Sequence, residues 1–97
     1  MNYEDIIKSD KPILVEFFDT WCPHCHRMAP IVEQVAELLD GRAPVYQLDI
    51  DKNQEIADYQ NVQSVPTFIV YKNGTEQWRH SGEIDGNDLL AKIEQYE

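Results

Sequence analysis

Two cysteines, Cys22 and Cys25, are the only thiols in this chain of 97 residues. A secreted scaffold held by disulfides has more cysteines at wider spacing, so one close pair indicates redox chemistry or metal binding. At the start of a helix, backbone N–H groups and the macrodipole would stabilise the Cys22 thiolate, the form that attacks disulfides. Cys25 could then attack a mixed disulfide on Cys22 and release the product. We therefore expect Cys22 to be an exposed nucleophile and Cys25 to be the buried resolving thiol.

A zinc site and a structural disulfide are the alternative uses of this pair. A structural zinc ion takes four ligands, usually from two separated pairs, whereas His80 is the only histidine far from the cysteines in sequence. A disulfide between Cys22 and Cys25 closes too short a loop to stabilise the fold much through chain entropy. We therefore expect no metal and no dissociable cofactor, because the redox-active pair would itself carry the electrons.

Imidazole and guanidinium groups gather around the cysteines in an otherwise acidic chain. His24 lies between the two thiols, and His26 and Arg27 follow them. A hydrogen-bond donor or a positive charge at this place favours a thiolate. We therefore predict that His24 tunes the Cys22 thiolate. For His26 and His80 we predict the ordinary role of surface or hydrogen-bonded histidines.

Glu16 interrupts an apolar, β-rich run over residues 13–18. Such a run predicts a central strand that is covered on both faces. A buried carboxyl group needs a partner or keeps its proton, so its pKa rises. We predict that Glu16 lies beneath the cysteines as a proton donor and acceptor and removes the proton of Cys25 during resolution. The alternative is a strand position that reaches water.

The remaining residues predict the elements that position this site. Periodicity predicts helices over residues 3–9, 22–39 and 53–59, a last helix capped by Asp85, and strands over residues 13–18, 45–50, 67–71 and 77–81. Strand–helix–strand units pair in parallel through a right-handed crossover, and Asn73-Gly74 predicts a hairpin that adds one antiparallel edge. The expected fold is a single α/β domain over residues 1–97, with a small four-stranded mixed sheet flanked by helices on both faces.

Composition and charge narrow the functional classes. A 42% hydrophobic content suits one compact domain, and the formal net charge of −10 would repel nucleic acid and anionic membranes. No apolar run approaches the roughly 20 residues that cross a bilayer. The N-terminus has neither the positive charge nor the apolar stretch of a secretory signal. We expect a cytoplasmic protein, although a signal removed before residue 1 would leave the same sequence.

Short motifs along nearly the whole chain resemble those of the thioredoxin family. The matching segments are Ile13-Leu14-Val15-Glu16-Phe17-Phe18, Trp21-Cys22-Pro23-His24-Cys25, Met28-Ala29-Pro30, Leu48-Asp49-Ile50-Asp51, Val65-Pro66-Thr67-Phe68 and Lys72-Asn73-Gly74. The resemblance implies a thioredoxin fold and a thiol–disulfide oxidoreductase, a reductase of protein disulfides. Its electrons would come from a thioredoxin-reductase-like partner or a small thiol. We expect the protein to act as a monomer.

The same resemblance implies a substrate groove beside the cysteines. Pro66 would follow a cis peptide bond and face the pair, while Val65 would present its backbone to an extended substrate. Gly82 matches the family glycine that lets the substrate approach closely. Trp21 would be the aromatic residue beside the nucleophile, and Pro23 would border the groove between the two cysteines.

The chain departs from the thioredoxin pattern at four places. Thioredoxins proper carry Gly-Pro between the cysteines, whereas Pro23-His24 resembles thiol oxidases of the DsbA type, although the helical domain inserted in those proteins is absent. The buried acid of thioredoxins is usually Asp, whereas here it is Glu16. Many thioredoxins have a lysine near that acid. This chain has Gln47 there, which can donate a hydrogen bond to Glu16 but cannot stabilise its negative charge. The N-terminal segment is short, so we also expect the family's first edge strand to be absent. An oxidising function and a binding module with incidental redox activity are therefore the alternative functions.

Overall fold

The computed structural model describes residues 2–97. Its elements, in chain order, are α1 (Tyr3–Ile7), β1 (Ile13–Phe18), α2 (Pro23–Leu39), β2 (Val45–Asp49), α3 (Gln54–Tyr59), β3 (Thr67–Lys72), β4 (Thr75–Ser81) and α4 (Gly86–Gln95). This order confirms the predicted alternation of helices and strands. No helix within residues 2–97 has both the length and the apolar character that a bilayer crossing requires.

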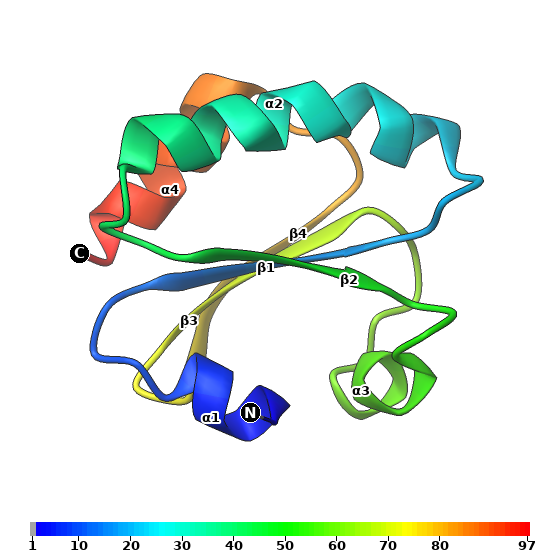
Figure 1. Ribbon diagram of the computed structural model, residues 1–97, viewed down its shortest axis with the longest axis horizontal. Helices are drawn as coiled ribbons and strands as arrows, with labels where there is room; N and C mark the ends of the chain where they lie inside the picture. Colours follow the sequence, from blue (N-terminus) through cyan, green and yellow to red (C-terminus); the bar gives the residue numbers. More distant parts are fainter. Residues whose placement is uncertain (1) are drawn as a thin grey trace.

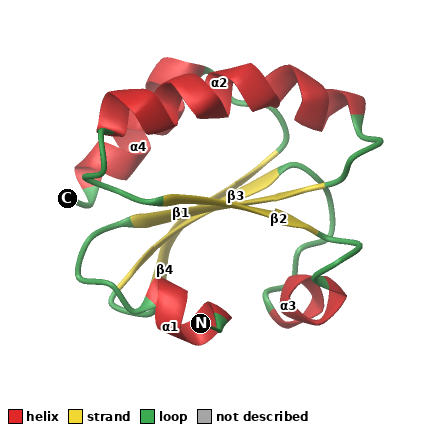
Figure 2. Cartoon of the chain, viewed as in Figure 1, coloured by secondary structure: helices red, strands yellow, loops and turns green. Residues whose placement is uncertain are grey.

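A four-stranded mixed sheet in the order β2-β1-β3-β4 forms the middle layer of the molecule. Helices α2 and α4 cover one face of this sheet, and α1 and α3 lie against the other (Figure 1). Figure 2 shows the same layering, with the strands enclosed between two groups of helices. The predicted fold class is confirmed.

The direction of β3 corrects one expectation. Strand β1 pairs in parallel with β2, as its crossover through α2 requires, but it pairs antiparallel with β3. Helix α3 has only six residues, so at about 1.5 Å per residue it is too short to carry the chain back along a strand. The chain therefore enters β3 at the edge where β2 ends. The second strand–helix–strand unit is not parallel.

Alternating side chains of β1 feed two hydrophobic clusters, one on each face of the sheet. Leu14 packs into the cluster under α2 and α4, whereas Val15 and Phe17 pack into the cluster over α1 and α3. The side chain of Glu16 shares the face of Leu14, because successive residues of a strand point to opposite faces. The acid therefore lies on the side of the sheet that α2 covers.

The Asn73-Gly74 turn explains two boundaries that differ from the sequence prediction. Helix α1 ends at Ile7 rather than at residue 9, because the carbonyls of Ile7 and Ser9 accept hydrogen bonds from Gly74 N (2.9 Å) and Asn73 N (2.8 Å). The hairpin at Asn73-Gly74 is confirmed, and both of its residues have positive φ (54° and 80°). Because this turn is so tight, β4 begins at Thr75, two residues earlier than expected.

The cap of α4 gives a test of local stability. The Asp85 carboxylate accepts hydrogen bonds from Asn87 N (2.9 Å) and Asp88 N (3.4 Å), as predicted for an N-cap. Replacing such a cap by alanine costs about 1 kcal/mol. We expect Asp85→Ala to lower the melting temperature by about 4–8 °C, measured by calorimetry. Asp85→Asn, which keeps an acceptor oxygen, should stay close to the wild type; equal losses in both variants would contradict the capping role.

Candidate active site

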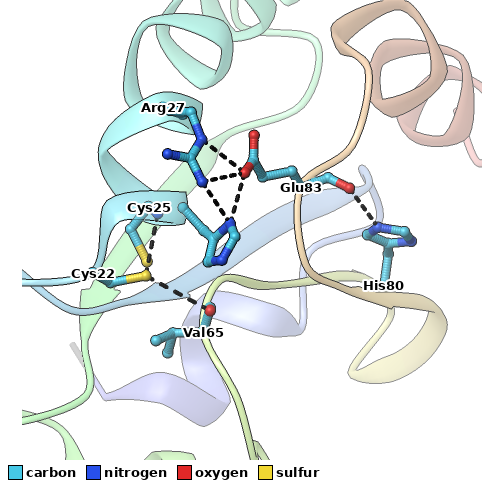
Figure 3. Close-up of polar contacts among 7 residues, drawn as sticks. Cys22, Cys25, Arg27, Val65, His80 and Glu83 are labelled. Carbon is cyan, nitrogen blue, oxygen red and sulfur yellow. Dashed lines mark hydrogen bonds and ion pairs between the residues drawn. The ribbon is translucent and has the colours of Figure 1, made fainter.

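Cys22 is the N-cap of α2, and its sulfur serves as the cap. Its backbone is extended (φ −89°, ψ 114°), and its Sγ accepts a hydrogen bond from the backbone N–H of Cys25 at 3.2 Å (Figure 3). Pro23 follows in the first turn, where its missing N–H costs nothing. Because the first N–H groups of a helix have no intrahelical acceptor, this position favours negative charge on the sulfur.

Both thiols are free, and both cysteines are only 5% exposed. The expectation of an exposed Cys22 is therefore wrong. The segment before β3 covers this residue, since Cys22 Sγ lies 3.7 Å from the carbonyl oxygen of Val65. Sequence reasoning missed this cover because the contact spans 43 residues of chain. The sulfur of Cys22 therefore lies at the junction of α2 with the segment that precedes β3.

The Val65–Pro66 peptide bond is cis, as predicted. The hydroxyl of Thr67, a buried residue, donates to Ser64 O at 2.7 Å and so fixes the segment that precedes β3. On the other side, Gly82 N donates to Pro66 O at 2.8 Å. These contacts hold the Val65 carbonyl in place beside Cys22 Sγ.

The other residues assigned to the groove lie around this junction. Gly82 has φ +97°, and a Cβ built there would meet nothing within 4 Å, so the backbone conformation calls for glycine and the space beside it is open. Trp21 precedes Cys22 and is 71% exposed, and Pro23 is exposed as well. The chain thus offers apolar side-chain surface directly beside two covered sulfurs.

Glu16 is buried, as predicted, and only 1% exposed. Its Oε1 accepts a hydrogen bond of 2.9 Å from the side-chain amide of Gln47, its register partner on β2. Burial raises the pKa of the Glu16 carboxyl, and the Gln47 bond offsets part of this rise. A cavity of about 250 Å³ is lined by Glu16, Gln47 and Cys25 among others. Acid and second cysteine therefore border one space that is large enough for water.

The two thiols have different environments. Burial, together with the hydrogen bond and charge of Cys22, raises the pKa of Cys25 to about 12. Cys25 thus holds its proton at neutral pH, while its backbone N–H donates to the sulfur of Cys22. The roles of Cys22 as nucleophile and Cys25 as resolving thiol stay a prediction.

His24 contacts Glu83 and Arg27 in this structure. Its Nδ1 lies 2.7 Å from Glu83 Oε2 and 2.8 Å from Arg27 Nη2, and Arg27 Nε donates to the same carboxylate oxygen at 2.9 Å. The hydrogen bonds to His24 and Arg27 lower the pKa of Glu83. Tuning of Cys22 by His24 stays a prediction. Sequence reasoning missed Glu83, whose only signal is its place after Gly82.

The other two histidines have structural hydrogen bonds, as predicted. His26 Nε2 lies 2.5 Å from Thr20 O, and His80 Nε2 lies 3.0 Å from Glu83 O. The His80 ring also stacks on Trp78, with ring centroids 6.0 Å apart. Neither imidazole has a hydrogen bond to a sulfur within residues 2–97.

The Thioredoxin family model matches residues 1–95. The chain belongs to the thioredoxin family. It is 40% identical over 94 residues to Thioredoxin Y, chloroplastic, of Oryza sativa subsp. japonica, covering 96% of this chain and 56% of that relative. It is 34% identical to a thioredoxin of Rickettsia bellii (strain RML369-C), covering 93% of this chain and 86% of that relative.

Solved thioredoxin structures have the same architecture. A mutant thioredoxin from Halobacterium salinarum NRC-1 superposes with a TM-score of 0.87 at 31% identity, covering 96% of this chain and 80% of that one. Fasciola hepatica thioredoxin gives a TM-score of 0.84 at 32% identity, covering 93% and 85%. The chain spans about half the length of the chloroplastic relatives, 56% of the rice protein and 55% of Thioredoxin Y1 of Arabidopsis thaliana.

The buried acid gives a prediction on the pH dependence of stability. Because the folded-state pKa of Glu16 is raised, the folded protein keeps this proton to higher pH than the unfolded chain. The resulting stabilisation is full below the ordinary pKa of 4.5 and is lost as pH rises through the folded-state pKa. Glu16→Gln removes this titration.

The difference in unfolding free energy, Glu16→Gln minus wild type, should therefore increase above pH 4.5 and then level off. Urea denaturation of both proteins over a pH series measures it. Glu33→Gln, at an exposed position of α2, is the matched control and should give a flat difference. A flat difference for Glu16→Gln as well would show that the carboxyl titrates normally.

Proposed function

We propose that this thioredoxin-family chain is a protein-disulfide oxidoreductase that works as a reductase through Cys22 and Cys25. One observation carries the proposal: Cys22 Sγ is capped by the Cys25 N–H at 3.2 Å and lies 3.7 Å from Val65 O. The cap stabilises a thiolate, and the Val65 carbonyl is a backbone acceptor for an extended peptide next to that sulfur. Nucleophile and peptide-binding group thus lie at one point.

In the first step the Cys22 thiolate attacks one sulfur of a substrate disulfide. A new S–S bond forms between Cys22 and that sulfur, the substrate S–S bond breaks, and the other substrate sulfur leaves as a thiolate that takes a proton. The Val65 carbonyl can accept a backbone N–H of the substrate during this step. Trp21 and Pro23 supply the exposed surface on which the substrate rests.

In the second step Cys25 resolves the mixed disulfide. Its thiol gives its proton to the Glu16 carboxylate through the shared cavity and attacks Cys22 Sγ. The S–S bond to the substrate breaks, the second substrate sulfur leaves as a thiolate that takes a proton, and Cys22 and Cys25 form a disulfide. Two electrons have passed from the pair to the substrate, so no dissociable cofactor is required.

A thioredoxin-reductase-like partner or a small thiol would return the two electrons. We propose a monomer acting in the reducing cytoplasm, because the chain has a single close CxxC pair, which serves exchange rather than a stable cross-link. The net charge of −10 supports a role without nucleic acid or anionic membranes. Relatives with chloroplastic names make the compartment itself a point to test, by localisation of the tagged protein.

Insulin reduction in the presence of dithiothreitol tests the proposed reaction. The wild type should precipitate insulin chains, and both Cys22→Ser and Cys25→Ser should lose the activity. Only Cys25→Ser should retain substrate as a mixed disulfide on Cys22, seen by non-reducing electrophoresis, because its resolving thiol is gone. A trapped adduct on Cys22→Ser instead would reverse the two roles. An inactive wild type with bound partner protein would favour a binding module.

His24 and Glu83 offer a paired test of the oxidising alternative. If His24 stabilises the Cys22 thiolate, His24→Pro destabilises the reduced protein and lowers the reduction potential, by about 30 mV for each unit that the Cys22 pKa rises. Glu83→Gln removes the negative charge beside His24 and should shift the potential in the opposite direction. Equilibration against glutathione buffers measures both variants. If His24→Pro left the reduction potential unchanged, Pro23-His24 would not be an oxidising motif, and the protein would be an ordinary thioredoxin-type reductase.

A further inference from the structure

Three carboxylates gather where β1 and β2 end. Asp19 directly follows β1, Asp49 is the last residue of β2, and Asp51 follows two positions later. One oxygen of each lies within 4.8 Å of the others. The two strands are parallel, with Phe18 opposite Asp49, so their carboxyl ends meet at one edge of the sheet (Figure 1, right). Such an edge is where open α/β sheets bind ligands.

The carboxylate of Asp19 has an oxygen that the protein leaves unsatisfied. The residue is only 1% exposed, and its Oδ1 accepts the backbone N–H of Thr20 at 2.8 Å. Its Oδ2 is buried and receives no hydrogen bond from an amide, hydroxyl or basic group among residues 2–97, and burial together with the neighbouring Asp51 and Asp49 carboxyls raises the pKa of Asp19. Since Oδ1 is engaged, Oδ2 is the oxygen that remains available to the cluster. A buried carboxylate oxygen without a partner is costly.

Neighbouring groups do not balance this charge. Asp49 Oδ1 accepts the backbone N–H of Asp51 at 2.9 Å, which orients the Asp49 carboxylate without neutralising it. The ion pairs found within the described residues all involve glutamates, so none joins Asp19, Asp49 or Asp51 to a lysine or arginine. Three carboxylates this close together repel one another unless a cation or a shared proton lies between them.

We propose that Asp19, Asp49 and Asp51 bind one hard divalent cation, Ca²⁺ or Mg²⁺. Carboxylate oxygens are the ligands these ions prefer, and water would complete the coordination. With three protein carboxylates and Asp51 exposed, the affinity should be weak, with a Kd of about 10⁻⁴–10⁻³ M. This departs from the expectation of no metal, which considered only sulfur and imidazole ligands.

The bound cation would join the β1–α2 connection to the end of β2. Asp19 lies on that connection, and its carbonyl oxygen accepts a 3.4 Å hydrogen bond from Cys22 N. Asp49 and Asp51 belong to the segment that leads from β2 into α3. The site is thus distinct from the thiols but tied by backbone to the start of α2. Its occupancy does not depend on the proposed exchange reaction.

Isothermal calorimetry of the chelator-treated protein with CaCl₂ and MgCl₂ in separate titrations tests the proposal. The wild type should show one saturable site for at least one of the ions. Asp51→Asn, an exposed change that should leave the fold intact, should weaken binding by about tenfold or more, because one ligand charge is lost. Asp10→Asn, equally exposed and equal in charge, is the control and should bind as the wild type does.

A structural readout accompanies the titration. Backbone NMR shifts should move with cation around residues 18–21 and 48–52 in the wild type, and the melting temperature should rise over that in chelator. In Asp19→Asn both responses should be lost. Absence of saturable binding for both ions would overturn the proposal and leave a shared proton as the occupant. Equal weakening in Asp10→Asn and Asp51→Asn would overturn it in favour of diffuse attraction to the net charge.

Discussion

Pairing of β1 with a strand on each side is the constraint on which the rest of the structure depends. β1 lies between β2 and β3, parallel to one and antiparallel to the other. At its carboxyl end, β2 therefore also ends and β3 begins. The loop to α2, the loop to α3 and the cis segment before β3 consequently meet at one edge. Cys22 and Val65 come together there because of strand order, although 43 residues separate them.

The two sulfurs are equally buried but have different neighbours within a single helix turn. The sulfur of Cys22 takes the place of the side-chain oxygen of an ordinary N-cap and accepts a backbone N–H. Cys25 instead lines a cavity together with Glu16 and Gln47. Polar contacts of Glu83 with His24 and Arg27 join the loop after β4 to α2. The start of α2 and the loop after β4 are therefore linked by ion pairs.

Local features of the sequence predicted much of this. The C-x-x-C spacing, the Asn73-Gly74 turn and the interrupted strand at Glu16 each act over a few residues, and each was confirmed in place. The cover over Cys22 and the direction of β3 were predicted wrongly, because periodicity shows which residues are buried but not which segment buries them. Glu83 and the Asp19 cluster were missed, since only tertiary contacts bring their members together.

The cover over the cysteines has a consequence for oxidative damage. Oxidation of a thiol to sulfenic and then to irreversible sulfinic acid follows both thiolate character and access. In this structure the helix N-terminus favours a thiolate at Cys22, but solvent has little access to it, because Cys22 is only 5% exposed. Peroxide in solution therefore has little access to this sulfur. The cover over Cys22 therefore limits direct contact between its sulfur and oxidants in solution.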